Sequence, residues 1–563
     1  MSSFFDDASL VQIPSGYKVG TLFSIKPTDG TGDLTFTRSN DTATRVGPDS
    51  LSEKVRTNLV LQSQDFATTW GTSAGITLTS GQTDPFGGTD AFLVNFGTSL
   101  GNSISQSLSL VLGVPYTLSA YIKGVDLTGL RMIVADNSSV SVMSQVVNGT
   151  WVRVVLTGTA ATTGSLTNQI VRSDNTLDQS FYIYGAQIET GDIATDYIAT
   201  TTAAVSVGMT ANVPRVDYSG GGCPKLLLEK QSTNLVTYSE QFDNAAWSTS
   251  DVTVTANTTI SPSGYQDADT INATAEGQRI NQTISVIANT QYTFSFYAKK
   301  GTMVTPRYSV YDLSNGALII AQVDYSNLVN TSTWSRVTAT FTTPSGCTSI
   351  FVYPINGAST GTIFLWGCQL EAGSYVSSYV PTIASSVTRL ADAAYKTGIS
   401  SLIGQTEGVV FIDFVWNQLT GTGSYPRIIE AWNNSSNYIQ LFNVAGTSTV
   451  YYEISNGGAI QFSGNTTMNL GRNKLALAYK LNDCVFYKNG SLIASDTSAT
   501  IPTTNDLGIC GTYNGTAGAQ LSASVNQAIL FPTRLTNDQL ADLTGGNITT
   551  FNALATLYGY TIL

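Results

Sequence analysis

The strongest constraint on the fold of this chain is a phrase that it contains twice. EKVRTNLVLQSQDF begins at Glu53 and EKQSTNLVTYSEQF begins at Glu229, 176 residues later, with eight of fourteen positions identical. The same spacing aligns YTLSAYIKG at Tyr116 with YTFSFYAKK at Tyr292. Ordered matches at a nearly constant spacing over about 150 residues indicate a duplicated domain, because solenoid repeats are much shorter.

Each copy alternates apolar and polar residues as a β-strand does. In the first copy the alternation places Tyr116, Leu118, Ala120 and Ile122 on one face of a strand. Strand-like runs recur between Gly, Ser and Asn, and neither copy shows a helical pattern of three turns. We therefore expect two β-sandwiches, in which the repeated asparagines, Asn58 and Asn234, satisfy backbone groups at a turn.

Composition narrows the possible partners and the compartment. Charged residues make up only 11% of the chain, and the net charge is −12 without a basic cluster. This argues against nucleic acid and anionic membranes as partners, since both attract concentrated Lys and Arg. The odd cysteine count, five, predicts free thiols in a reducing compartment. We see no signal peptide, transmembrane or lipidation motif, so assembly in a cytoplasm without membrane insertion is expected.

After about residue 385 the repeat ends and a third all-β pattern begins. GVVFIDFVW, from Gly408, is apolar on both strand faces. NKLALAYKLNDCVFYKNGSLIASD, from Asn473, indicates three strands joined by turns at 482–483 and 489–490. Thr536 and Gln539 predict the capping box of a short helix that stops near Gly545. A second helical stripe is expected at 551–557.

Several stretches resemble known families. TNLVTYSEQFDNAAW, YTFSFYAKKG and WGCQLEAGSYVSSYVPT resemble the carbohydrate-binding-module-like jelly rolls of bacteriophage tail fibres and virion surface proteins. LAYK, FYKNGSLIAS and ILFPTRLTNDQLADL resemble the concanavalin A/laminin G-like lectin sandwich. The expected order is an N-terminal attachment segment (1–52), jelly-roll module 1 (53–200), a linker (201–228), jelly-roll module 2 (229–385) and the lectin-like domain (386–563).

The residues give little sign of catalysis. The chain contains no histidine, which removes His-based nucleophile systems and His-ligated zinc, and no nucleotide-binding or hydrolase motif occurs. A glycosidase needs only two carboxylates, so this class stays open. Because Glu189/Glu371 and Asp136/Asp312 are matched between the copies, a structural or metal-turn role is expected for them. No cofactor is predicted, although jelly rolls of this kind allow a structural calcium ion whose ligands the sequence does not identify.

A glycan site combines an aromatic face with hydrogen-bonding side chains, and we searched turn-like stretches for both. Two stretches of the lectin-like domain qualify, TGSYPRIIEAWNNSSNY and GTYNGTAG. The candidate glycan ligands are Tyr425, Trp432, Asn433, Asn434, Tyr438, Tyr513 and Asn514. The alternative is that Trp432 belongs to the core and that the asparagines form turns. The matched tryptophans of the two copies are expected to be framework.

The expected function is host-surface recognition, through a glycan, by a non-catalytic tail or head fibre of a phage virion. The resemblance implies a homotrimer, and the N-terminal segment would bind other virion proteins. Two alternatives remain: a purely structural virion protein without a ligand, and an enzyme that degrades surface polysaccharide.

Overall fold

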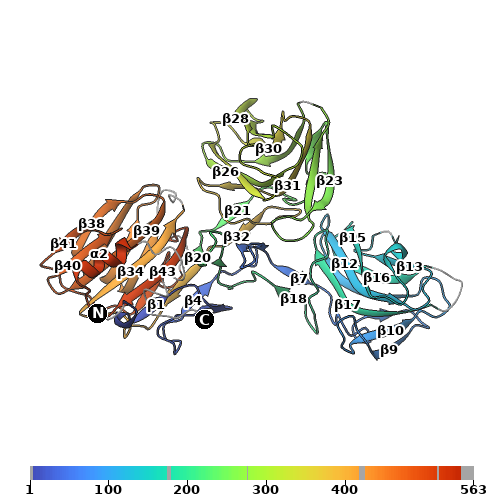
Figure 1. Cartoon of the computed structure of the whole chain (residues 1–563), viewed down its shortest axis with the longest axis horizontal. Helices are drawn as coiled ribbons and strands as arrows, with labels where there is room; N and C mark the ends of the chain where they lie inside the picture. Colours follow the sequence, from blue (N-terminus) through green and yellow to red (C-terminus); the bar gives the residue numbers. More distant parts are fainter. Residues whose placement is uncertain are drawn as a thin grey trace.

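The chain folds almost entirely into β-strands. The computed structural model describes residues 4–137, 139–173, 179–275, 277–417, 425–515 and 519–546, and three β-sandwiches stand apart in Figure 1. Within these ranges, helix is limited to α1 (Phe4–Asp7), α2 (Asn537–Gly545) and the 3-10 turn η1 (Met143–Gln145). None of these helices has the length and apolarity to cross a membrane. The predicted all-β architecture of tandem sandwiches is confirmed.

Module 1 is a sandwich of two five-stranded antiparallel sheets. The first sheet runs β15 (Val152–Thr159), β12 (Pro115–Gly124), β17 (Ser180–Thr190), β10 (Ala91–Asn95), β9 (Thr77–Gln82). The second runs β14 (Val140–Ser141), β13 (Leu130–Ile133), β16 (Gly164–Arg172), β11 (Ser103–Leu110), β8 (Gly71–Thr72). The face of β12 that was predicted to be apolar, from Tyr116 to Ile122, packs into the core between the sheets.

Module 2 repeats this topology strand for strand. Its first sheet runs β29 (Ser335–Thr342), β26 (Gln291–Lys300), β31 (Gly361–Ala372), β24 (Ala268–Ala273), β23 (Val252–Thr259). Its second runs β28 (Ala317–Asp324), β27 (Arg307–Asp312), β30 (Ser349–Asn356), β25 (Arg279–Ser285), β22 (Ser248–Ser250). The matching order of all ten strands confirms the duplication.

The repeated asparagine ties the first strand of each module to its last long strand. The Asn58 amide donates to the carbonyls of Ala186 and Ile198, at 3.1 and 2.7 Å, and its oxygen accepts from the backbone N–H groups of Val60 and Ile188. Asn234 makes the same four bonds in module 2. Both side chains are fully buried. The predicted structural role of this phrase is confirmed.

The terminal sandwich packs an eight-stranded sheet against a nine-stranded one. The eight-stranded sheet runs β19 (Val216–Asp217), β20 (Lys225–Leu228), β43 (Ala523–Phe531), β34 (Glu407–Trp416), β39 (Gly471–Lys480), β40 (Cys484–Lys488), β41 (Ser491–Asp496), with β1 (Leu10–Gln12) also pairing with β43. The nine-stranded sheet runs β2 (Tyr17–Lys18), β3 (Thr21–Leu22), β4 (Leu34–Thr37), β33 (Ala393–Lys396), β42 (Asp506–Ile509), β35 (Arg427–Asn434), β36 (Asn437–Asn443), β37 (Thr449–Asn456), β38 (Ala459–Thr467).

This pairing corrects the predicted separation of residues 1–52 and 201–228 from the last domain. Strands β1 to β4 and the hairpin β19–β20 are built into the terminal sandwich, and the blue β1 and β4 lie against its orange and red strands in Figure 1. Leu10, Phe36 and Leu226 are buried in its core. Each module is therefore a separate insertion into this sandwich: module 1 lies between β4 and β19, and module 2 lies between β20 and β33.

Both faces of β34 are buried, as its sequence predicted. Val410, Ile412 and Phe414 face the core between the sheets. Val409 and Phe411 face a second cluster that α2 covers.

Helix α2 begins with the predicted capping box. The Thr536 hydroxyl accepts from the Gln539 N–H, and the Gln539 side chain accepts from the Thr536 N–H. The helix includes Gly545 and is capped by Gly546, two residues later than the prediction of Gly545 at the C′ position implies. The helix predicted at 551–557 lies outside the described residues.

Short two-stranded ribbons connect the sandwiches. They are β5 (Arg45–Val46) with β6 (Ser52–Glu53), β7 (Arg56–Asn58) with β18 (Val205–Val207), and β21 (Ser232–Asn234) with β32 (Val387–Arg389).

A buried charge cluster lies where the ribbons meet the terminal sandwich. Arg38, Arg215 and Arg389 surround Glu229 and Asp392, and all five side chains are at most 2% exposed. Burial alone would raise the pKa of Glu229, but the Arg389 and Arg215 charges outweigh it and lower that pKa to about 2.

Candidate functional site

The structure brings together three of the predicted aromatic residues on the outer face of the nine-stranded sheet. Trp432 on β35 and Tyr438 on β36 are direct cross-strand partners, and Tyr513 lies in the loop that follows β42. The Trp432 ring lies parallel to Tyr438 at a centroid distance of 5.3 Å and to Tyr513 at 5.2 Å. We call these three residues the Trp432 stack.

Both faces of Trp432, the central ring of the stack, are covered by other side chains of the protein. Strand β35 lies between β36 and β42, so Tyr438 and Tyr513 approach Trp432 from opposite sides and cover both of its faces. All three residues remain half-buried, with their edges toward solvent. A pyranose therefore has no free Trp432 face to stack on, and the contacts left to it are the ring edges and the outer tyrosine faces.

Two carboxylates hold the stack in place. Glu430 accepts from the Tyr513 N–H at 2.6 Å and from the Arg427 guanidinium at 3.1 Å. Glu453 accepts from the Tyr438 hydroxyl. Burial, together with this hydrogen bond to Glu453, raises the pKa of Tyr438 to about 12. Glu430 and Glu453 thus serve as positioning groups for the aromatic rings.

The remaining predicted residues do not join the stack. Asn434 accepts from the Ser436 N–H and forms the turn between β35 and β36, as the alternative reading expected. Asn433 and Asn514 are exposed, and Asn514 accepts from the Thr512 hydroxyl. Tyr425 is 60% exposed and packs edge-on against Phe442 rather than against Trp432.

Module 2 carries a second aromatic surface that the sequence reasoning missed. Along β30, Ile350 and Val352 point into the core, so Phe351 and Tyr353 point outward. Phe351 pairs across the sheet with Tyr311 of β27, and the two rings lie 6.3 Å apart and nearly parallel. These side chains line a groove of about 680 Å³ on the outer face of this sheet, which we call the module 2 groove.

Hydrogen-bonding side chains complete the module 2 groove. Asn281 and Arg279 line it from β25 and Asn356 from the end of β30. Asn356 donates to the Ser309 hydroxyl at 2.6 Å, which fixes the orientation of its amide. Two exposed leucines, Leu313 and Leu318, and the small polar side chains of Ser248, Thr249 and Ser250 complete the lining. Adjacent aromatic rings, amides and a guanidinium in a shallow groove suit a sugar chain.

Module 1 lacks this arrangement on the equivalent sheet. Phe351 pairs with Thr283 in module 2, and at the same register in module 1 Thr167 pairs with Ser107. Likewise Gln169 of module 1 stands in the register position of Tyr353. Ser103 replaces Arg279 at the spacing of 176. The two copies share a framework but not an outer surface.

The sequence analysis missed these aromatic residues because it looked for glycan sites in turn-like stretches, whereas Tyr311, Phe351 and Tyr353 lie inside strands. The alternation in SIFVYPIN, which begins at Ser349, already places Phe351 and Tyr353 on one face. A position-by-position comparison of the two copies would have singled them out, because the framework residues match and these do not.

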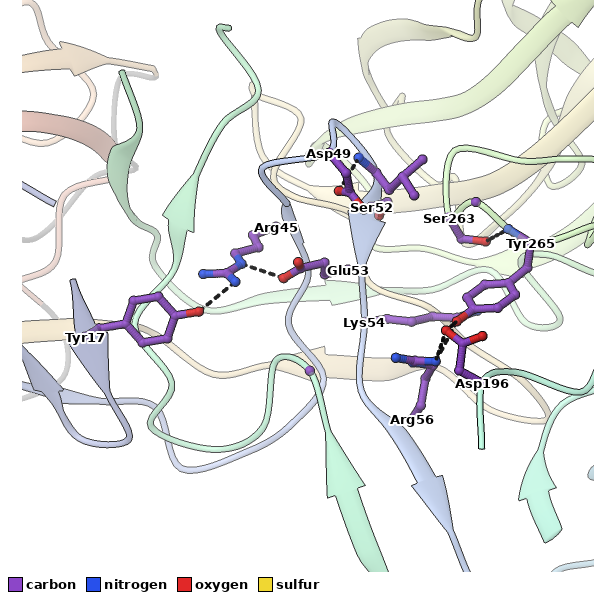
Figure 2. A pocket seen from close by; sticks show the side chains of 13 residues that line it. Tyr17, Arg45, Asp49, Ser52, Glu53, Lys54, Arg56, Asp196, Ser263 and Tyr265 are labelled. Carbon is purple, nitrogen blue, oxygen red and sulfur yellow. Dashed lines mark hydrogen bonds and ion pairs between the residues drawn. The ribbon is translucent and has the colours of Figure 1, made fainter. Parts of the chain in front are cut away.

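A further cavity, of about 540 Å³, lies at the junction of the three sandwiches (Figure 2). Several of the charged groups that line it are paired with their neighbours. Arg45 donates to Glu53 at 2.7 Å and to the Tyr17 hydroxyl at 2.7 Å, and Arg56 donates to the Tyr265 hydroxyl (Figure 2). The contacts join the terminal sandwich to the ribbons and to module 2, so this cavity belongs to a joint.

Three of the four matched carboxylates have the expected structural role: Glu189, Glu371, and Asp312, which accepts from the N–H groups of Ser314 and Asn315 at a turn, whereas Asp136 is exposed. Glu189 accepts from the N–H and the hydroxyl of Thr195, and Glu371 accepts from the same groups of Ser377. Across the described ranges, no three Cys, Asp or Glu side chains gather in a way that would hold a metal ion. The described structure leaves all five cysteines as free thiols, which confirms that prediction.

Comparison with protein families adds an independent observation on module 2. Residues 234–355 match a family described as a carbohydrate binding domain. All of the groove residues named above except Asn356 fall inside this range. A comparison with curated proteins gives no match.

Three solved structures illustrate the proteins to which parts of this chain are similar. The CBM40 of the Ruminococcus gnavus IT-sialidase is 18% identical over 26% of this chain and 91% of its own, with a TM-score of 0.23. The CBM22 tandem of Paenibacillus barcinonensis Xyn10C is 12% identical over 60% and 99%, with a TM-score of 0.23. The tailspike protein 4 of bacteriophage CBA120 is 19% identical over 25% and 21%, with a TM-score of 0.21.

Proposed function

We propose that this chain is a non-catalytic glycan-recognition protein of a bacteriophage virion, and that it binds glycan through the module 2 groove. The carrying observation is that Tyr311, Phe351, Tyr353 and Asn281 line one groove within the stretch that matches a carbohydrate binding domain. Module 1 would then act as a spacer that presents module 2. The virion role is supported by the resemblance of the repeated phrases to phage fibre modules.

The Trp432 stack is the second candidate contact. Three ring edges open side by side on the nine-stranded sheet, and positioned carboxylates flank them. In this role the stack would contribute an edge-on contact, weaker than that of a flat stacking platform.

The test is binding of the full chain to a glycan array and to host cells, with Phe351→Ala and Trp432→Ala compared side by side. We expect Phe351→Ala to abolish glycan binding and Trp432→Ala to reduce it less. Loss through Trp432→Ala alone would move the site to the terminal sandwich. If the folded wild-type chain binds neither glycans nor cells, a structural virion protein is the better description, whereas release of reducing ends from host glycans would show an enzyme.

The predicted homotrimer and the contacts to other virion proteins stay predictions. Because residues 10–37 are part of the terminal sandwich, the proposed virion contacts would be made by this sandwich and not by a separate tail. Light scattering of the purified chain measures the oligomeric state, and antibody labelling of virions measures the location.

A further inference from the structure

Among the described residues that line the module 2 groove, Arg279 is the one charged side chain, and no described residue pairs with it. Its guanidinium is exposed and forms no hydrogen bond or ion pair with another residue of the described ranges. Apart from Arg131 in module 1, every other arginine of the described structure is engaged in such a contact. An unpaired guanidinium in a groove is therefore unusual within this chain.

The described residues that line the groove around Arg279 include no carboxylate that would neutralise it. Its groove neighbours are Ser, Thr, Asn, Leu and aromatic side chains, and no Asp or Glu is among the described residues that line the groove. The Arg279 charge also reaches the Tyr353 ring, because it partly offsets the rise in the pKa of Tyr353 that burial causes. The groove thus has a local positive charge on a chain whose net charge is −12.

We propose that the module 2 groove selects an anionic saccharide, whose carboxylate or phosphate binds Arg279 while a neighbouring ring packs on Tyr311 and Phe351. This inference rests on the proposed function of the groove and adds the class of ligand. A planar guanidinium offers paired donors that match a carboxylate or a phosphate. Asn281 and Asn356 supply uncharged contacts for sugar hydroxyls at the same end of the sheet.

The net charge of the chain makes this local charge important for selectivity. At low ionic strength an acidic protein repels an anionic glycan, so binding requires a positive site at short range. Salt screens both the repulsion by the net charge and the attraction by Arg279. We therefore expect the preference for anionic over neutral glycan to depend on ionic strength, whereas the aromatic contact does not.

The experiment uses the full chain and three tetrasaccharide probes measured by calorimetry: a glucuronic acid oligomer, its neutral glucose counterpart and a phosphorylated glucose oligomer. The variants are Arg279→Gln, Phe351→Ala and, as a matched loss of one unpaired positive charge outside the groove, Arg131→Gln. We expect Arg279→Gln to weaken the anionic probes about tenfold and leave the neutral probe unchanged. Arg131→Gln should behave like the wild type.

The outcomes separate this inference from the proposed function. If Phe351→Ala removes binding but Arg279→Gln leaves the ratio of anionic to neutral affinity unchanged, the groove stands and its selectivity for anions fails. Wild-type chain that prefers the neutral probe, or binds neither anionic probe, also overturns the inference. If glycan binds and Phe351→Ala has no effect, the groove itself is not the site. Stronger binding of the phosphorylated probe than of the uronic acid probe identifies phosphate as the recognised group.

Discussion

Replacing Asp392 by Asn should destabilise the junction of the three sandwiches. The Asp392 carboxylate is fully buried and accepts hydrogen bonds from Arg215, from the Glu229 N–H at 2.9 Å and from Arg38 at 3.4 Å. It is one of two carboxylates among three guanidiniums, so its neutralisation raises the net charge of the cluster from about +1 to +2. Breaking a buried ion pair on one side costs about 3–5 kcal/mol, since the remaining charge stays buried without compensation.

The cost should appear as a lower midpoint of thermal unfolding. For a unit of about 200 residues, 1 kcal/mol shifts the midpoint by about 2–4 °C, so we expect a decrease of about 6–20 °C in the transition of the terminal sandwich. Differential scanning calorimetry measures this transition separately from those of the two modules, if these unfold independently.

The matched control is Asp483→Asn, which breaks an ion pair with Arg534 at a site where Asp483 is 48% exposed. Exposed pairs contribute less than about 1 kcal/mol, so this control should shift the midpoint by only a few degrees. Equal shifts for the two variants would refute the reasoning, because they would mean that burial of the cluster adds nothing.

Three further predictions concern the modules and α2. Asn58→Ala and Asn234→Ala each remove four buried hydrogen bonds. Each substitution should lower the free energy of unfolding of its own module by about 3 kcal/mol or more, which urea titration measures. A difference of several kcal/mol between the two variants would contradict the equivalence of the two asparagines. Burial raises the pKa of Asp269 to about 7 despite two backbone hydrogen bonds. The folded state therefore holds a proton that the unfolded state has lost above pH 4, and module 2 should lose stability from about pH 4 to 7. The difference between wild type and Asp269→Asn should follow this slope in melts at pH 5 and 8, and a difference independent of pH would count against it. Thr536→Ala should cost about 1 kcal/mol through loss of the α2 cap, and hydrogen exchange at the start of α2 should rise in parallel; unchanged exchange there would speak against the cap.

The sequence was sufficient for the modules because their signals are local and doubled. Alternation fixed which face of β12 and β26 is buried, and the repetition of Asn58 at Asn234 marked a buried polar role. The pairing of β1 with β43 could not be predicted in this way. A strand of three residues carries no usable period, and its partner lies more than 500 residues away.

The candidate sites were predicted only in part. Trp432, Tyr438 and Tyr513 do lie together, but a list of aromatic residues does not say that neighbouring rings cover both faces of Trp432. The groove of module 2 depends on register: Phe351 reaches Tyr311 only because the two strands pair at these positions. Composition and turn signals contain no information on such lateral contacts.

The interwoven terminal sandwich has a consequence for synthesis of the chain on the ribosome. Leu10 is made about 500 residues before its partner Leu530. At about 5–20 residues per second this interval lasts about 25–100 s. During that time modules 1 and 2 have complete sets of strands and can fold, and β2, β3 and β4 can pair with one another, while β1 still lacks its partner β43. A nascent chain arrested before β43 would thus carry two finished modules and an unpaired β1, because β43 joins β1, β20 and β34 in the eight-stranded sheet.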